Sequence, residues 1–161
     1  MGAVVAAGVA NASPATKKIS FKGTYSGTAS LLIENSSVKI LSVAGTGKSS
    51  VIGSGSLSGT GKGTGANGQC VPFNGKGSLK GASGTIKFSV TSSKSQGCSS
   101  GQSGPVTVTV TGSAKVTSGS GKAKGAKGTL KFSGTLKLND TSGSQSGAFN
   151  GKLTGNLTVN K

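Results

Sequence analysis

Histidine, arginine and tryptophan are absent from this chain of 161 residues, and only two residues are acidic. Without histidine, proton transfer at neutral pH would depend on Glu34 and Asp140, which are far apart in sequence and each lie beside an asparagine in a turn-like stretch. A metal centre also lacks most of its usual ligands. The sequence therefore predicts a protein that is not an enzyme, with no catalytic residue, no cofactor site and no metal site.

Large apolar side chains are scarce as well, since aromatic residues make up 4% of the chain, whereas glycine occurs 30 times. Glycine, serine and threonine are poor helix formers, and here they recur every few residues. The composition thus excludes a helical protein. It leaves either disorder or a β-fold whose tight turns and close strand approaches use the glycines.

Apolar and polar residues alternate through most of the chain, which favours the folded β alternative. One face of a predicted strand carries Ile86, Phe88 and Val90. One face of another carries Val106, Val108 and Val110. Alternation with a period of two is typical of a sheet that has one buried and one solvated face. Disordered chain has no reason to keep that phase over so many segments.

The chain also repeats itself, over residues 75–117 and 119–161. The shared core is Lys-Gly-Ala-x-Gly-Thr-(Ile/Leu)-Lys-Phe, which starts at Lys80 and again at Lys124. Duplicated hairpins suit an antiparallel meander that closes into a barrel, because closure removes exposed sheet edges. We therefore predict one all-β domain over 17–161, an antiparallel closed barrel of about eight strands. A β-solenoid or a β-sandwich is the alternative, and whether a barrel would be filled or hollow stays open.

The segment 116–134, VTSGSGKAKGAKGTLKFSG, resembles the glycine-rich motif of allene oxide cyclase and dirigent-type barrels, which many small exported bacterial proteins share. This resemblance implies a closed antiparallel barrel of about eight strands. The aromatic residue expected near Ala123 is missing, and no carboxylate or arginine matches a dirigent-type pocket. We therefore expect this chain to share the fold of these families but not their activity.

Charge is strongly one-sided, because eighteen basic residues, all lysine, give a formal net charge of +16. Such a field favours contact with polyanions, but lysine lacks the planar fork that arginine uses for specific phosphate recognition. Anionic polymers are the expected partners, namely wall polysaccharide, acidic glycan or non-specific nucleic acid. Homo-oligomerisation is left open. The densest basic run supplies the candidate contact residues: Lys122, Lys124, Lys127, Lys131 and Lys137.

Two features predict an oxidising, extracellular location or the cell surface. Cys70 and Cys98 lie in turn-like contexts, and we expect them to form a disulfide. Residues 1–16 contain a run of small apolar residues followed by Ala10-Asn11-Ala12, which fits a secretory cleavage site. We interpret this segment as a signal-peptide remnant or a flexible N-terminus. No other segment approaches the length needed to span a membrane.

These properties give two functional hypotheses. The first is a binding module that contacts anionic polymers through its lysines or holds a small ligand in the barrel. The second is a structural or self-associating extracellular protein. A string that resembles a phosphate-binding loop, Val38 to Ser49, supports neither hypothesis, since the glycine-rich chain after it could not form the required helix.

Overall fold

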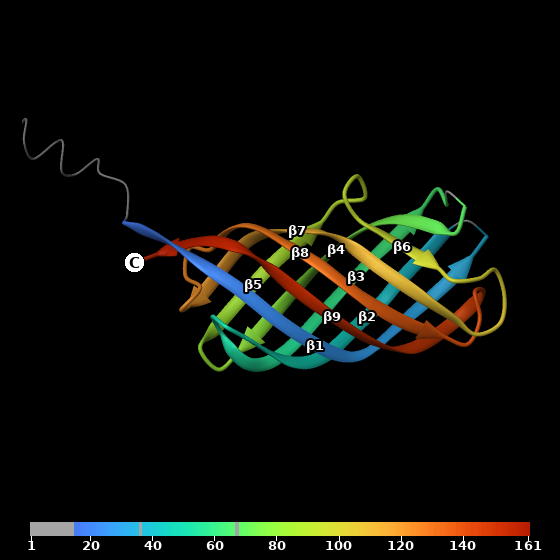
Figure 1. Ribbon diagram of the computed structural model, residues 1–161, viewed down its shortest axis with the longest axis horizontal. Coiled ribbons are helices and arrows are strands. Elements are labelled where there is room, and N and C mark those ends of the chain that lie inside the picture. The colour runs from blue at the N-terminus through green and yellow to red at the C-terminus, as the bar shows by residue number, and fades with distance from the viewer. Residues whose placement is uncertain (1–14, 36, 67) are drawn as a thin grey trace, which may run out of the picture.

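The computed structural model describes residues 15–161 except residues 36 and 67, and within them the regular structure is entirely β (Figure 1). The strands are β1 (Thr16–Glu34), β2 (Ser37–Ser49), β3 (Gly53–Thr64), β4 (Cys70–Gly81), β5 (Gly84–Val90), β6 (Gln96–Ser99), β7 (Val106–Gly121), β8 (Lys127–Leu138) and β9 (Gly143–Asn160). The expected segment 1–16 falls almost wholly outside the described residues, and β1 begins at Thr16.

All strand pairs are antiparallel and the sheet closes on itself. Its order is β3-β2-β1-β9-β8-β7-β5-β4-β6, and β3 also pairs with β4. β5 and β6 occupy one position between β4 and β7, since each of them pairs with both neighbours. The result is the closed antiparallel barrel of about eight strands that the sequence predicted, with one strand position split in two.

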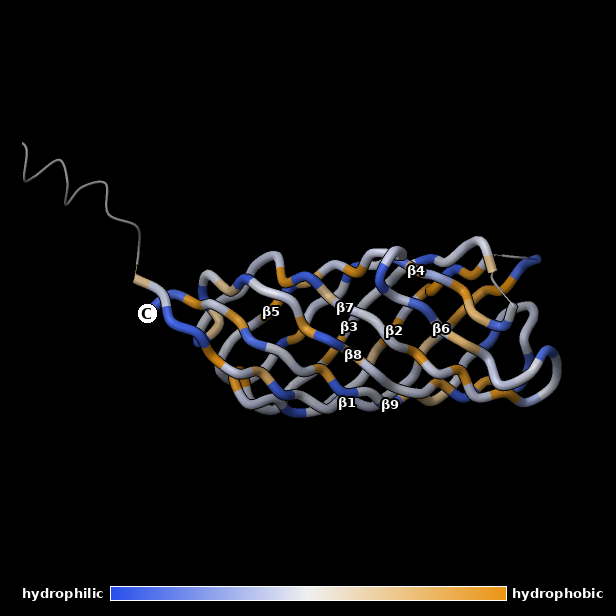
Figure 2. Tube along the Cα trace, turned by 45° about the horizontal axis from the view of Figure 1, so that its top comes forward, coloured by the Kyte–Doolittle hydropathy of each residue, from blue (hydrophilic) through white to orange (hydrophobic). Residues whose placement is uncertain are grey.

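Side chains alternate between the interior and the outer wall, so polar and apolar residues alternate along each strand (Figure 2). Outward positions carry mostly serine, threonine, asparagine and lysine. The predicted apolar phases are correct: Ile86 and Val90 are buried, and Lys87 between them is exposed. In β2 the pairing register shifts between Ile40 and Val43. Such a bulge changes the side-chain phase, which leaves Leu41 outside with 53% of its surface exposed.

Each aromatic residue is paired across the sheet with a glycine. Phe88 lies opposite Gly77 and Phe132 lies opposite Gly112. A Cβ atom at Gly112 would lie 2.6 Å from the Phe132 ring, so the ring occupies the space that a side chain would need. The other pairs are Phe21–Gly155, Tyr25–Gly47, Tyr25–Gly151, Phe149–Gly27 and Phe73–Gly63.

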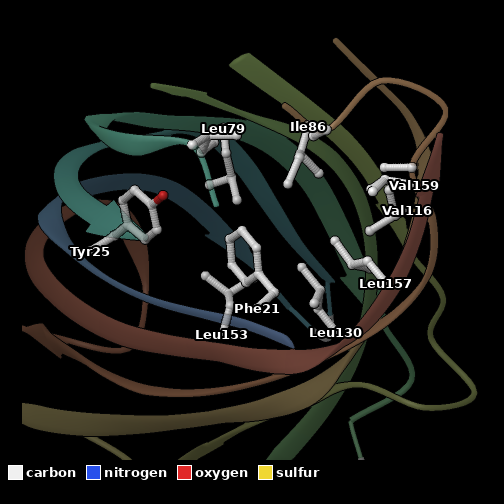
Figure 3. Close-up of a cluster of buried hydrophobic side chains, with 12 residues drawn as sticks. Phe21, Tyr25, Leu79, Ile86, Val116, Leu130, Leu153, Leu157 and Val159 are labelled. Carbon is white, nitrogen blue, oxygen red and sulfur yellow. The ribbon is translucent and has the colours of Figure 1, made fainter. Parts of the chain in front are cut away.

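One end of the barrel, which we call the closed end, is filled with side chains (Figure 3). Ile52 from the β2–β3 turn and Ala123 and Ala126 from the β7–β8 connection are fully or almost fully buried there. Backbone hydrogen bonds join the turns: Ser83 N–H donates to the Ile52 carbonyl at 3.0 Å, and Lys122 N–H donates to the Ser83 carbonyl at 2.8 Å. The cluster also contains Phe21, Tyr25, Leu79, Ile86, Val116, Leu130, Leu153, Leu157 and Val159.

The repeated sequence motif corresponds to a repeated structure at this closed end. Each copy leads into a strand that leaves the closed end, first β5 and then β8. Gly84 and Gly128 hold the same place in the two copies, and both have positive φ, 155° and 137°. L side chains rarely adopt this backbone conformation, so the motif keeps glycine there. Ile86 and Leu130, two residues later in each copy, are both fully buried.

Candidate functional site

The other half of the barrel is hollow. A cavity of about 360 Å³ extends from Tyr25 and Leu153, which belong to the closed-end cluster, to the opposite end of the barrel, which we call the mouth. The side chains at its mouth are mainly aliphatic, including Leu31, Ile33 and Leu138. No histidine, arginine or acidic side chain belongs to the lining. The sequence left open whether the barrel is filled or hollow. In the structure the closed end is filled with side chains and the mouth end is hollow.

The cavity exists because many inward positions have no side chain. Of the inward residues of β3, only Leu57 has a side chain, and the others are glycines. An eight-stranded barrel is just wide enough for its side chains to fill or for one small ligand. Because β3 has almost no inward side chains and the aromatic rings lie over glycines, the centre of the mouth half is empty.

The loops at the mouth are held in place by Asp140. Its Oδ1 accepts hydrogen bonds from the backbone N–H of Thr141 at 2.7 Å and of Gly104 at 3.2 Å. Thr141 Oγ1 in turn donates to the Gln102 carbonyl at 2.7 Å. The carboxylate thereby joins the β8–β9 loop to the loop that precedes β7. This is the turn chemistry that the sequence indicated for Asp140.

Glu34, the other carboxylate, ends β1 on the same rim and is exposed. Its backbone carbonyl accepts a hydrogen bond from Ser37 Oγ at 3.1 Å across the tight β1–β2 turn. Asn35 in that turn has a φ of 51°. Nothing in this arrangement brings Glu34 to the cavity lining, where it would meet a bound molecule.

Tyr25 lies at the inner end of the cavity and retains only 3% of its surface. Its ring packs near Phe21 and over Gly23 toward the closed end. The phenolic oxygen is buried and has no hydrogen-bond partner among the described residues. Burial raises the pKa of Tyr25, and the neighbouring Ser49 hydroxyl acts in the opposite direction but more weakly. The Ser49 Oγ instead accepts a hydrogen bond from the Ile52 N–H at 3.2 Å.

The five candidate lysines do not gather in one place. Lys122 and Lys124 lie in the β7–β8 connection at the closed end, and Lys127, Lys131 and Lys137 point outward along β8. At a rise of about 3.3 Å per residue, Lys127 and Lys137 are about 33 Å apart. They line the length of the outer wall, and none of the five contributes to the cavity.

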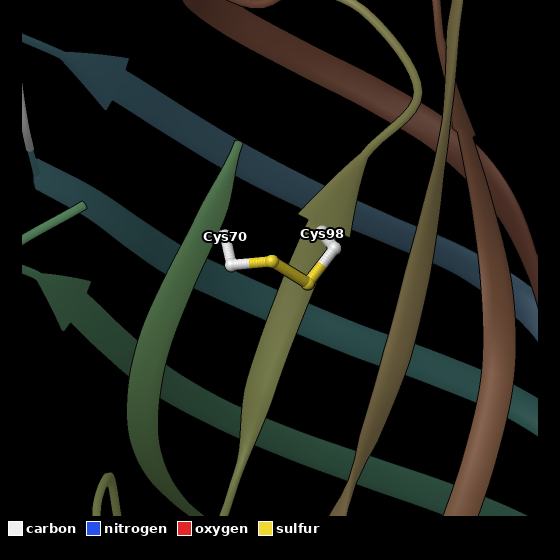
Figure 4. Close-up of a disulfide and its surroundings, with 2 residues drawn as sticks. All are labelled: Cys70 and Cys98. Carbon is white, nitrogen blue, oxygen red and sulfur yellow. A yellow bond between two sulfur atoms is a disulfide. The ribbon is translucent and has the colours of Figure 1, made fainter. Parts of the chain in front are cut away.

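The predicted disulfide is present. Cys70 and Cys98 pair directly opposite each other on β4 and β6 and are bonded with an S–S distance of 2.03 Å (Figure 4). The bond fixes the short strand β6, which has only four residues, to the barrel wall beside the mouth. The cavity lining includes Gly97 and Ser99, the two neighbours of Cys98 on β6.

Comparison with known proteins finds no match for this chain among family models, curated proteins or solved structures. The described residues contain no helix with the length and hydrophobicity needed to cross a bilayer. Nor do they contain a group of three or more His, Cys, Asp or Glu residues arranged to hold a metal ion. The class of protein defined by the fold is a closed meander barrel with an apolar cavity at one end.

Proposed function

We propose that this protein is a non-catalytic extracellular or cell-surface binding module that holds one small, uncharged, apolar molecule inside its barrel. The observation that carries the proposal is the 360 Å³ cavity with its predominantly aliphatic and aromatic lining. Concave apolar sites of roughly 300–1,000 Å³ are typical of small-molecule binding. An oxidising location is supported by the Cys70–Cys98 disulfide, since such bonds are rare in cytosolic proteins.

The ligand class follows from the groups that line the cavity. Burying an ionised group without a partner is costly, and the deep lining offers no charged side chain that points inward. Polar lining groups lie toward the mouth, where Gln69, Ser99 and Thr141 are found. A largely hydrocarbon molecule with a single neutral polar group near the mouth fits this distribution.

The test uses a neutral fluorescent probe, N-phenyl-1-naphthylamine, because an anionic dye would be attracted to the lysines. We expect saturable 1:1 binding that changes little with salt. Gly151→Val places a side chain in the cavity at a position where a Cβ atom meets only ordinary contacts, the nearest at 3.4 Å. This variant should weaken probe binding about fivefold or more by loss of space.

The matched control is Ala148→Val, which adds a valine to the same strand at an exposed outward position. It should leave the affinity for the probe unchanged. Equal losses in the two variants, or probe binding that does not saturate, would contradict the proposal. Thermal unfolding of both variants verifies that each is folded.

A further inference from the structure

A second hollow lies on the outer wall and has a different character from the barrel cavity. It is a groove of about 290 Å³, lined mostly by polar residues, between the outer faces of β3 and β4 and the loop that joins β5 to β6. We call it the wall groove; its lining residues are Lys62, Thr64, Pro72, Asn74, Ser92 and Ser93.

The pairing register places a second lysine beside Lys62, the one lysine that lines this groove. Lys39 on β2 lies directly opposite Lys62 on β3, and both point outward. Like charges directly opposite each other destabilise a sheet. Elsewhere in the described strands each paired lysine faces a neutral residue, mostly serine or threonine, as Lys131 faces Ser113 and Thr154. The one Lys–Lys pair of the described strands thus borders the wall groove, to which Lys62 belongs.

The groove is held in shape before any ligand arrives. The Ser95 carbonyl accepts a hydrogen bond from Phe73 N–H at 3.2 Å, and Lys94 N–H donates to the Thr91 carbonyl at 3.1 Å. Ser95, buried to 4% exposure, also accepts a hydrogen bond from Ser113 N–H at 3.3 Å through its Oγ. These bonds and the nearby disulfide fix the loop that carries Ser92 and Ser93 against β4. Preorganised sites lose less entropy on binding.

We propose that the wall groove binds one acidic residue of a polysaccharide. Lys62 in the groove and Lys39 on the neighbouring strand would hold the carboxylate or sulfate of the sugar, while Asn74, Ser92 and Ser93 would form hydrogen bonds with its hydroxyl groups. The site is separate from the barrel cavity, so the proposal does not depend on a ligand inside the barrel.

A polysaccharide fits this surface better than a nucleic acid does. Single-stranded nucleic acid is held by bases that stack on exposed aromatic rings. Here every aromatic residue lies on the inward phase of its strand, and arginine is absent. The groove offers one point charge, Lys62, with a second on the adjacent Lys39, and neutral hydrogen-bonding groups, which match a charged sugar with several hydroxyls.

The experiment measures binding of a uronic-acid hexasaccharide by calorimetry, at low and at physiological salt, beside a neutral glucose hexasaccharide and a twelve-residue oligo(dT). We expect measurable binding of the acidic sugar, none of the neutral sugar and weaker binding of oligo(dT). Lys62→Gln and Lys39→Gln should each reduce affinity for the acidic sugar about three- to fivefold. Asn74→Ala should reduce it without changing the salt dependence, because it removes no charge.

Lys131→Gln is the matched control, since it removes the same charge from an outward lysine that has only hydroxyl residues opposite it. It should alter affinity for the acidic sugar less than twofold. An equal loss in Lys131→Gln would show a diffuse charge effect and overturn the proposal. Tighter binding of oligo(dT) that depends on Lys39 and Lys62 would assign the groove to nucleic acid instead. Absence of binding to the acidic sugar would also overturn it, and unchanged binding of the neutral probe would show that the cavity proposal stands separately.

Discussion

At the scale of single residues, Tyr25 is the clearest departure from ordinary packing. Its hydroxyl is buried with no partner among the described residues, and such a group costs about 1–3 kcal/mol. Tyr25→Phe removes the hydroxyl and keeps the ring over Gly23. We expect this variant to raise the free energy of unfolding at pH 7 by about 1 kcal/mol. Urea denaturation measures the change, and a loss of stability would show that the hydroxyl has a partner after all.

The same residue predicts a pH dependence. Burial raises the pKa of Tyr25 in the folded protein above its ordinary value of 10.0. Below pH 10 the phenol is neutral in the folded and the unfolded protein, so ionisation of Tyr25 does not yet lower the free energy of unfolding. As pH rises through the folded-state pKa, the unfolded chain has already released the proton and stability is lost. Tyr25→Phe lacks this loss, and the gap between variant and wild type should therefore widen above pH 10. The two proteins differ only at position 25, so the comparison isolates Tyr25.

Asp140 acts locally on the loops of the mouth. Asp140→Ala removes the acceptor of two backbone N–H groups, those of Thr141 and Gly104. We expect a loss of about 1–2 kcal/mol in unfolding free energy and faster amide hydrogen exchange at these two residues. Asp140→Asn keeps one acceptor oxygen and should lose less. Unchanged exchange at Gly104 in Asp140→Ala would contradict this role.

At the scale of the strands, glycines that face each other across the sheet are not equivalent. Gly134 on β8 lies opposite Gly151 on β9. A Cβ atom at Gly134 would overlap the Asn150 carbonyl oxygen and lie 2.9 Å from the Gly151 Cα, whereas one at Gly151 meets nothing closer than 3.4 Å. Gly134→Ala should therefore destabilise by about 1–3 kcal/mol. Gly151→Ala should be neutral or should stabilise by up to about 1 kcal/mol.

Measuring both alanine variants under identical conditions makes each the control of the other. They add the same methyl group to paired positions on the inner wall. If both lose the same stability, the close approach of the β8 and β9 backbones at Gly134 is not what keeps glycine there. A general intolerance of side chains on this wall would then be the explanation.

The same scale shows why only part of the structure could be predicted from the sequence. Apolar alternation identified the inward-facing residues of β5 and β7, because period two is a local signal, and the internal repeat and the glycine-rich motif indicated the closed barrel. The hollow half was not predicted, since alternating glycine in β3 resembles low-complexity chain. The signal for it is the glycine at nearly every inward position of β3, where only Leu57 has a side chain, and Gly59 and Gly61 lie opposite Val43 and Ile40 of β2. The Lys39–Lys62 pair could not be seen either, because it depends on the register between two strands and on the bulge in β2.

At the scale of the whole molecule, closure of the sheet makes the barrel a single cooperative unit. Each strand contacts two neighbours, and the described strands leave no long free edge. The Cys70–Cys98 bond adds a covalent constraint across 28 positions of the chain and joins β4 to β6, which shares one strand position with β5. The disulfide is therefore expected to stabilise the entire ring, although it lies at one place on its wall.

This expectation gives the last prediction. In the chain-entropy account, a cross-link that closes a loop of this length stabilises by about 3.5 kcal/mol. The double variant Cys70→Ala/Cys98→Ala should therefore lose about 2–4 kcal/mol in unfolding free energy and still unfold in one transition. Denaturant unfolding followed by circular dichroism measures both quantities, and wild type in strong reductant should match the variant. A separate early transition would contradict a single cooperative ring, because it would show that β6 and the mouth beside it unfold while the closed end remains folded.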